Sequence, residues 1–214
     1  MIDRIPRRLR VAFTRAGARA EPTADAAVLA DGDTEVDFVA YGEDCILSGR
    51  TVLDGDRLTD MLNDHDEYAL IGVTVERFDD GMSMEVEEVV VGRDELWLVH
   101  ASGPRGDAAR RHRTSPQHVA MQMGPYKVRG FYHALPGTDP VTAMRRRKPM
   151  VPLTGVRIEY ELGGVTREDR VDTVIVNREQ IEWIEAIEPD RAEFPDRVKR
   201  PVKDRPKRLA THRP

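Results

Sequence analysis

The chain has a single cysteine, few aromatic residues and no long hydrophobic run. Among its 214 residues Cys45 is the only cysteine, and aromatic residues make up 6%. One thiol can form neither an intramolecular disulfide nor a cysteine-rich zinc site, so the fold has to rest on its hydrophobic core. No segment approaches the roughly 18 apolar residues that a membrane-spanning helix needs. These absences exclude a disulfide scaffold and a helical integral membrane protein.

Both ends of the chain differ in composition from its middle. Residues 1–35 are rich in alanine, arginine and aspartate with little periodicity, which predicts a mobile N-terminal segment. Residues 189–214 combine frequent prolines with an excess of Lys and Arg, which predicts a disordered basic tail. The first residues lack the continuous apolar segment of a secretory signal, so we expect a cytoplasmic protein that does not associate with membranes.

The formal net charge of -5 conceals blocks of opposite sign. Residues 31–103 carry a net charge of -16, residues 104–150 carry +8, and residues 151–188 carry -5. Each block's self-repulsion is relieved by the next, so the pattern favours contacts between parts of one chain or between subunits. The other interpretation is a solvated charged surface, because charge bias alone says little about fold or partner.

Two parts of the chain resemble each other at a nearly constant offset. Residues 68–76 match residues 151–159 at an offset of 83, with Gly72 over Gly155. Two further matches follow the same order: 56–61 with 139–144 at an offset of 83, and 89–96 with 174–181 at an offset of 85. The change of offset fits a hairpin that is longer by two residues in the second copy. Ordered matches of this kind predict an internal duplication.

The duplication defines the expected domain organisation. We assign an acidic β-rich repeat to residues 36–102, a basic linker to 103–121 and a second β-rich repeat to 122–188. Apolar residues alternate with polar ones in both repeats, which is typical of β-strands. The predicted fold class is mainly β with short helices, as two tandem small β-barrel or sheet units packed together. Whether the units form separate barrels or share strands is left open.

Each repeat also predicts hairpin turns and one short helix. Gly81 and the pair Gly163 and Gly164 supply the positive φ of tight hairpins. A helix over 56–63 is expected with Asp56 as its N-cap, and its counterpart begins at Pro140. Before the last strand of each repeat, Gly92 and Asn177 tolerate left-handed backbone and so predict a turn.

Two groups of residues are candidate contact sites. Arg57, Asp60 and Asn63 form a polar surface on the first helix, which the second repeat lacks. The alternative is structural: Arg57 pairs with Asp60, and Asn63 ends the helix. The second group is a basic contact patch made of Arg110, Arg111, Arg113, Arg145, Arg146, Arg147 and Lys148.

No residues are assigned to catalysis, to a cofactor or to a metal. The sequence contains no glycine-rich phosphate loop, nucleophile elbow or dinucleotide fingerprint. Residues 31–37 imitate the opening of a calcium loop, but Val36 and Gly42 stand where glycine and glutamate are required. The acidic residues 64–67 are interpreted as a solvated turn, and Cys45 as a small buried hydrophobe. A catalytic role has no positive support here.

Two short motifs carry a resemblance to a known group of proteins. The order Arg-Leu-Thr-Asp-x-Leu-Asn at 57–63 and the sequence Asn-Arg-x-x-Ile at 177–181 resemble short bacterial domains that look like tandem Sm-type small β-barrels. The first motif stands only in the first repeat, and the second has its asparagine only in the second repeat. The resemblance implies a fold and no activity, and no functional residues carry over from it.

The leading functional interpretation is a binding or scaffold protein that is not an enzyme. Its oppositely charged repeats would set contacts with a protein partner or with further copies of the chain. One alternative is an RNA-associated Sm-like protein that uses the basic linker and tail, with Phe131 and Tyr132 as the best candidates for base stacking. A second alternative is a small enzyme or a regulatory subunit.

Overall fold

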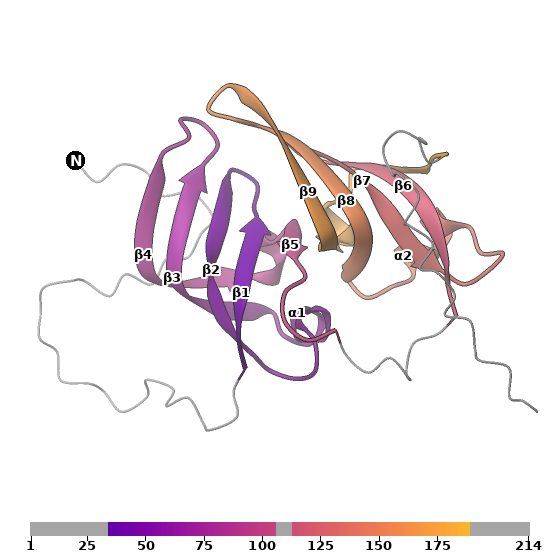
Figure 1. Ribbon diagram of the computed structural model, residues 1–214, viewed down its shortest axis with the longest axis horizontal. Coiled ribbons are helices and arrows are strands. Elements are labelled where there is room, and N and C mark those ends of the chain that lie inside the picture. Colours follow the sequence, from indigo (N-terminus) through magenta and orange to yellow (C-terminus); the bar gives the residue numbers. More distant parts are fainter. Residues whose placement is uncertain (1–33, 106–112, 189–214) are drawn as a thin grey trace, which may run out of the picture.

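The computed structural model describes residues 34–105 and 113–188 (Figure 1). This part of the protein is mainly β with two short α-helices, as the alternating apolar pattern predicts. The N-terminal half contains β1 (Thr34–Tyr41), β2 (Cys45–Leu53), α1 (Leu58–Asp64), β3 (Glu67–Arg77), β4 (Ser83–Gly92), the 3-10 turn η1 (Arg93–Glu95) and β5 (Leu98–His100). The C-terminal half contains β6 (Ser115–Met123), β7 (Tyr126–Ala134), α2 (Pro140–Arg145), β8 (Met150–Leu162), β9 (Val165–Asn177), the 3-10 turn η3 (Arg178–Gln180) and β10 (Trp183–Ala186).

All ten strands belong to one antiparallel sheet. Its order is β10-β6-β7-β8-β9-β5-β1-β2-β3-β4, so the two halves are joined where β5 pairs with β9. Closed barrels are not formed within the described residues, where β4 and β10 are the two edges of the sheet. The expectation of barrel units is therefore replaced by a continuous sheet, because the outer side of the short strand β5 is taken by β9 instead of β4.

Glycines bend both halves of the sheet at corresponding places. Gly72 in β3 and Gly155 in β8 have positive φ values of 60° and 58°, and each lies beside a register shift in the neighbouring strand pair. Gly49 and Gly130 sit at those shifts, and a Cβ atom at either position would lie 3.0 Å from a valine methyl carbon on the adjacent strand. The aligned glycines of the sequence are thus bulge residues, which allow the strands to curl sharply.

Two hydrophobic clusters form the core, and each takes residues from both halves. The first cluster gathers the inward residues of β1 to β5 and also contains Met150 and Ile175 from the C-terminal half. The second gathers the inward residues of β6 to β9 and also contains Tyr41, Ile46 and Leu98 from the N-terminal half. Because apolar residues cross the junction in both directions, neither core is complete without the other half.

The boundaries of the linker differ from the predicted ones. Strand β6 begins at Ser115, inside the segment 103–121 that the sequence assigns to a linker. Pro116 favours a loop there, but β10 covers only Val119–Gln122, so the proline lies where β6 pairs on one side only. The predicted mobile segment over 1–35 and the predicted tail over 189–214 fall almost wholly outside the described residues.

Local end signals are partly confirmed. Pro140 opens α2, and Asp139 caps it by accepting a hydrogen bond from the Thr142 N–H at 2.8 Å. The predicted cap Asp56 is wrong, because the N-cap position of α1 is Arg57 and no side chain caps it. Hairpin glycines have the positive φ that the sequence predicts. The predicted left-handed backbone at Gly92 and Asn177 is wrong, because both residues are extended. The predicted turns are present as the 3-10 turns that follow these residues.

We expect the substitution Gly49→Ala to destabilise the protein by about 1–3 kcal/mol, because its methyl group is forced against Val73 and against the Ile71 carbonyl oxygen at 3.1 Å. Gly42→Ala is the matched control, since its Cβ atom meets its nearest neighbours at an ordinary 3.5 Å. Chemical denaturation of both variants checks this. Equal midpoints for the two would show that the bulge does not need a glycine.

Candidate functional site

The junction of β5 and β9 is the most densely bonded feature that links distant parts of the chain. Leu98, Val99 and His100 face Val176, Ile175 and Val174 in register. The pairing is extended at both ends by the Asn177 N–H, which donates to the Trp97 carbonyl at 2.8 Å, and by the Ala101 N–H, which donates to the Thr173 carbonyl at 3.0 Å. Strand pairing therefore joins the halves through five consecutive residue pairs.

Asn177 locks this pairing with its side chain. Its amide nitrogen donates to the carbonyl groups of Arg93 and Leu96 at 3.1 and 3.0 Å, and its amide oxygen accepts from the Glu179 N–H at 3.1 Å. The residue is buried. A buried amide whose groups are all bonded fixes one register, because any shift would leave those groups unsatisfied. From the sequence, Asn177 was predicted only as a turn residue, and the bonds of its side chain were missed.

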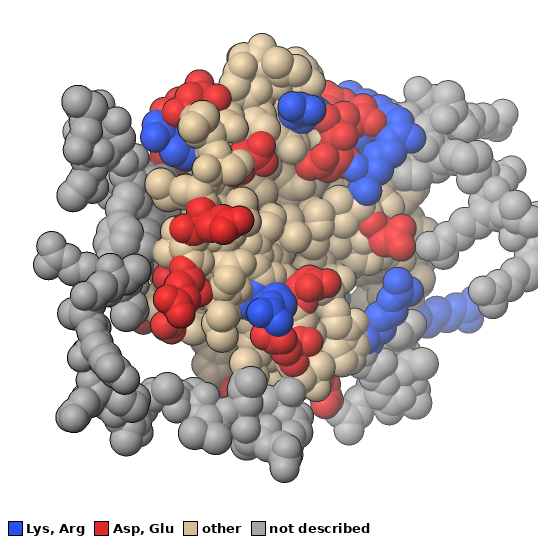
Figure 2. All heavy atoms as spheres, turned by 60° about the vertical axis from the view of Figure 1, so that its left-hand side comes forward, with Lys and Arg blue, Asp and Glu red and all other residues tan. Residues whose placement is uncertain are grey.

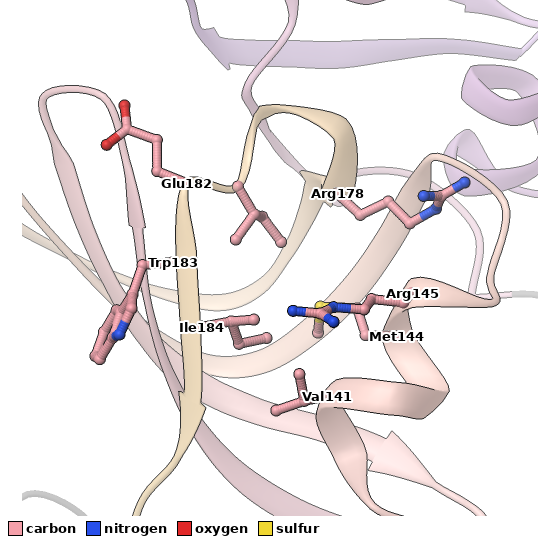
Figure 3. A pocket seen from close by; sticks show the side chains of 8 residues that line it. Val141, Met144, Arg145, Arg178, Glu182, Trp183 and Ile184 are labelled. Atoms are coloured by element: carbon pink, nitrogen blue, oxygen red, sulfur yellow. The ribbon is translucent and has the colours of Figure 1, made fainter.

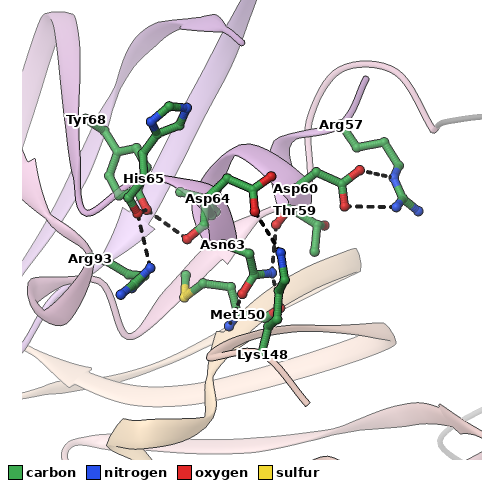
Figure 4. A network of polar contacts seen from close by, with 11 residues as sticks. Arg57, Thr59, Asp60, Asn63, Asp64, His65, Tyr68, Arg93, Lys148 and Met150 are labelled. Atoms are coloured by element: carbon green, nitrogen blue, oxygen red, sulfur yellow. Dashed lines mark hydrogen bonds and ion pairs between the residues drawn. The ribbon is translucent and has the colours of Figure 1, made fainter. Parts of the chain in front are cut away.

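Asn63 makes a second polar link across the junction (Figure 4). Its amide nitrogen donates to the carbonyl groups of Thr59 and Met150 at 2.8 and 2.9 Å, and its oxygen accepts from the Met150 N–H at 3.0 Å. Beside it, the Lys148 ammonium lies 2.7 Å from the Asp64 carboxylate. Asn63 therefore attaches α1 to the start of β8, whereas the sequence placed it at a helix end or on a polar surface.

The other two residues of the predicted polar surface form a pair. Arg57 donates to both carboxylate oxygens of Asp60, at 2.7 and 2.9 Å, and both side chains are exposed. The structural alternative therefore describes these two residues. Arg57, Asp60 and Asn63 do not act as one group, because Asn63 bonds to the C-terminal half while the other two bond to each other.

A partly buried polar cluster at the junction joins Tyr41 and His100 to Tyr160 and Asp169. Tyr41 and Tyr160 both donate their hydroxyl hydrogens to Asp169 Oδ2, at 2.7 and 2.9 Å. Because the Tyr41 hydroxyl hydrogen is used in this way, the His100 Nε2, 3.1 Å away, is the donor to the Tyr41 oxygen. Tyr126 packs its edge against Tyr41 at a centroid distance of 5.6 Å, and Phe78 stacks on Tyr160 at 5.6 Å.

The electrostatics of this cluster favour a structural role. Burial, followed by the hydrogen bonds to Asp169, raises the pKa of the Tyr41 and Tyr160 hydroxyls above their usual range. Burial lowers the pKa of His100, although the Asp169 charge opposes that shift. The two phenols are therefore held in their neutral form as hydrogen-bond donors to Asp169. Sequence reasoning missed this cluster, because Tyr41 and Asp169 are 128 residues apart.

The predicted basic patch is only partly visible. Arg110 and Arg111 lie outside the described residues, and Arg113 is exposed directly before β6. The run from Arg145 to Lys148 is exposed at the end of α2. Part of this run is engaged within the chain: Lys148 pairs with Asp64, and the Arg147 Nε donates to the Tyr132 hydroxyl at 3.3 Å.

The opposing acidic surface lies on the N-terminal half. Figure 2 brings the β4 side forward and shows carboxylates spread over this face, with the larger groups of basic side chains toward the right. In the acidic turn 64–67, Asp64 pairs with Lys148, and Asp66 lies 2.7 Å from the Arg93 guanidinium. Within the described ranges, no group of three His, Cys, Asp or Glu side chains is arranged to hold a metal ion.

A small pocket opens between α2 and β10 (Figure 3). It encloses about 90 Å³ and is lined by Val141, Met144, Arg145, Arg178, Ile181, Glu182, Trp183 and Ile184. Ligand sites for small molecules usually exceed about 300 Å³. This depression is large enough for one apolar side chain and too small for a typical metabolite.

The remaining candidates for chemistry are not activated. Cys45 is buried in the first core cluster, and burial raises the pKa of its thiol to about 12. A thiol in that state is not a nucleophile at neutral pH. Residue Cys45 therefore behaves as the small buried hydrophobe that the sequence predicts.

Comparison with known proteins gives no assignment: no family model, no curated protein and no solved structure matches the chain. Among the described residues, no helix is both long and apolar enough to cross a membrane.

We expect Asn63→Ala to lower the free energy of unfolding by about 2 kcal/mol, because the Met150 backbone groups lose their partner. Arg57→Ala is the matched control on the same helix and removes only an exposed ion pair, so it should cost about 0.5 kcal/mol or less. Urea unfolding of both variants measures this. A control as unstable as Asn63→Ala would refute the assigned link between α1 and β8.

The low pKa of His100 makes stability depend on pH. Since its pKa is below the unfolded value of 6.5, the unfolded chain binds more protons, and the stabilisation present above pH 6.5 is lost as the pH falls. His100→Gln should therefore flatten the fall in stability between about pH 7.5 and pH 5. Tyr160→Phe removes a hydrogen bond to Asp169 and should lower the free energy of unfolding equally at pH 7.5 and pH 5, so its dependence on pH should stay as in the wild type. Identical slopes for His100→Gln and the wild type would contradict this.

Proposed function

We propose that the protein is a binding or scaffold module without enzymatic activity, built from two duplicated β-rich units, which contacts protein partners through the edges of its sheet. One observation carries the proposal. In the described part of the chain, β5 and β9 pair on both sides, whereas β10 and β4, which hold the corresponding places in the other half, pair on one side only.

The duplication itself is supported by local geometry. Both halves run through the same order of strands, helix and 3-10 turn. A Cβ atom added to Gly49 or Gly130 would lie 3.0 Å from a methyl carbon of Val73 or Val156, respectively. The glycines of β3 and β8 with positive φ, Gly72 and Gly155, are 83 residues apart. Chance similarity of composition would not place a bulge at the same position in both halves of the sheet. The resemblance to Sm-type barrels and the cytoplasmic location stay predictions.

An open strand edge is a ready site for another chain. Its outward N–H and C=O groups lack partners, and addition of a further strand satisfies them. The apolar residues Val89 to Val91 give β4 the β-branched composition that favours pairing. Acidic residues on the N-terminal half and basic residues at the end of α2 supply charge complementarity for such contacts.

The RNA-associated alternative has less support from the described residues. Of the two aromatic candidates for base stacking, Tyr132 is buried, and Phe131 stacks on His118 at a centroid distance of 4.9 Å. Base stacking requires exposed aromatic faces. The enzyme alternative is disfavoured by a pocket of one side chain's size and by protonated phenol and thiol groups.

The test is amide hydrogen exchange of the full-length protein purified from its producing cells with nuclease treatment. We expect amides in β4 and β10 to exchange about tenfold or more slowly in the isolated assembly than in the dilute chain, because a partner strand bonds them. Strands β7 and β8 are the internal control, since each is already paired on both sides. Unchanged exchange at both edges, together with stoichiometric bound RNA when nuclease is omitted, would replace the proposal by its alternative.

A further inference from the structure

Core positions that are covered at the inner junction have uncovered counterparts at the outer edges. In β5, Leu98 pairs with Tyr41 and is fully buried in the second core cluster. In β10, Trp183 pairs with Gln122 and takes the same register position, but 49% of it is exposed. Leu98 is covered because β9 lies beside β5, and no described strand lies beside β10.

The same contrast appears at the opposite edge. Ile175 of β9 is fully buried and packs into the first core cluster, across the junction. At the offset of 85 its counterpart is Val90 in β4, which is half-buried. Each outer edge thus presents an apolar side chain where the inner junction buries one.

The pocket between α2 and β10 is the place that such a side chain would fill. Its apolar lining, Val141, Met144 and Ile184, corresponds in the N-terminal half to Leu58, Met61 and Val99. Those three residues share a cluster with Met150 and Ile175 of the other half. In Figure 3, Val141, Met144 and Ile184 converge on the space between α2 and β10, whereas Trp183 lies on the other side of the strand. Met150 and Ile175 in turn correspond to Glu67 and Val90 at the offsets of 83 and 85.

At one position, an apolar contact of the inner junction corresponds to a pair of charged residues at the outer edges. In the inner junction, Leu62 and Met150 belong to one apolar cluster. Their outer counterparts at the offset of 83 are Arg145, which lines the pocket, and Glu67. Both are exposed, and their charges are opposite. At this position the two edges are therefore complementary to each other and not each to itself.

We propose that the occupant of these edges is a second copy of this chain, which pairs its β4 with β10 of the first and places Val90 in the pocket between α2 and β10. The inference rests on the proposed function and names its partner. Copying the inner register puts Val91 opposite Trp183, Val90 opposite Ile184 and Val89 opposite Glu185, with Glu67 beside Arg145.

This contact is head to tail. Each added copy leaves one β4 edge and one β10 edge uncovered, so association proceeds beyond a dimer to a closed ring or an open chain. The outer contact is weaker than the inner one, because Gly92 stands at the place of Asn177 and has no amide side chain. Its N–H instead donates to Glu95 Oε2 at 2.8 Å. Association should weaken as salt rises, because the Glu67 and Arg145 charges are screened.

The experiment is a charge exchange in the full-length chain, followed by light scattering and by the fluorescence of Trp183. Glu67→Arg and Arg145→Glu each place like charges across the contact and should raise the dissociation constant about tenfold. An equimolar mixture restores both opposite pairs, so it should associate as the wild type does and shift the Trp183 emission to shorter wavelength. Arg113→Glu is the matched control, with the same change of charge at an exposed residue outside α2, β10 and the pocket.

The results separate the inference from the proposal on which it rests. A wild-type chain that stays monomeric at its highest soluble concentration overturns the inference. Association that neither exchange weakens and no mixture restores also overturns it. If a different protein protects β4 and β10 in the assembly from cells, the proposed function stands and the second copy is the wrong partner. If neither edge is protected in any assembly, both fail.

Discussion

The pairing of β5 with β9 is the interaction on which the rest of the structure depends. Side chains of a strand alternate between its faces, so this three-residue strand directs Leu98 into one core and Val99 into the other. Its partner β9 does the same in the opposite direction with Val176 and Ile175. Two small sheets that would each be marginal by themselves become one body because they share these two strands.

Polar groups decide the register of this pairing, and apolar groups supply its strength. Asn63 and Asn177 bond carbonyl groups of the opposite half, and Asp169 accepts hydrogen bonds from both halves. A slip by one residue would exchange the faces of every side chain and would leave the buried Asn177 and the partly buried Asn63 and Asp169 without these partners. The junction is therefore specific as well as stable, and the valine-rich strands by themselves would not ensure that.

The sequence predicts local features well and distant pairings poorly. Period-two alternation, hairpin glycines and the proline at the start of α2 act within a few residues, so they are readable without a fold. The offset of 83 aligns Gly72 with Gly155, and the two residues have φ values of 60° and 58°. The sequence left open whether the units form separate barrels or share strands, because no local signal distinguishes pairing of β5 with β9 from pairing of β5 with β4. The contacts of the candidate site could not be predicted for the same reason. Asn63 was interpreted as a helix end, whereas its partner Met150 is 87 residues away in the sequence. Between the acidic and basic blocks, Lys148 and Asp64 form one exposed ion pair across the two halves.

The insertion of Met150 and Ile175 into the first core has a consequence for synthesis on the ribosome. A chain grows from its N-terminus, so β1 to β5 emerge well before these two residues exist. Until then the first core has an open side, and β5 has an unpaired edge of apolar residues. The N-terminal half consequently waits in an incomplete state in which a chaperone, or the same half of a neighbouring nascent chain, competes with β9 for that edge. Slow translation through residues 106–175 would lengthen this exposure.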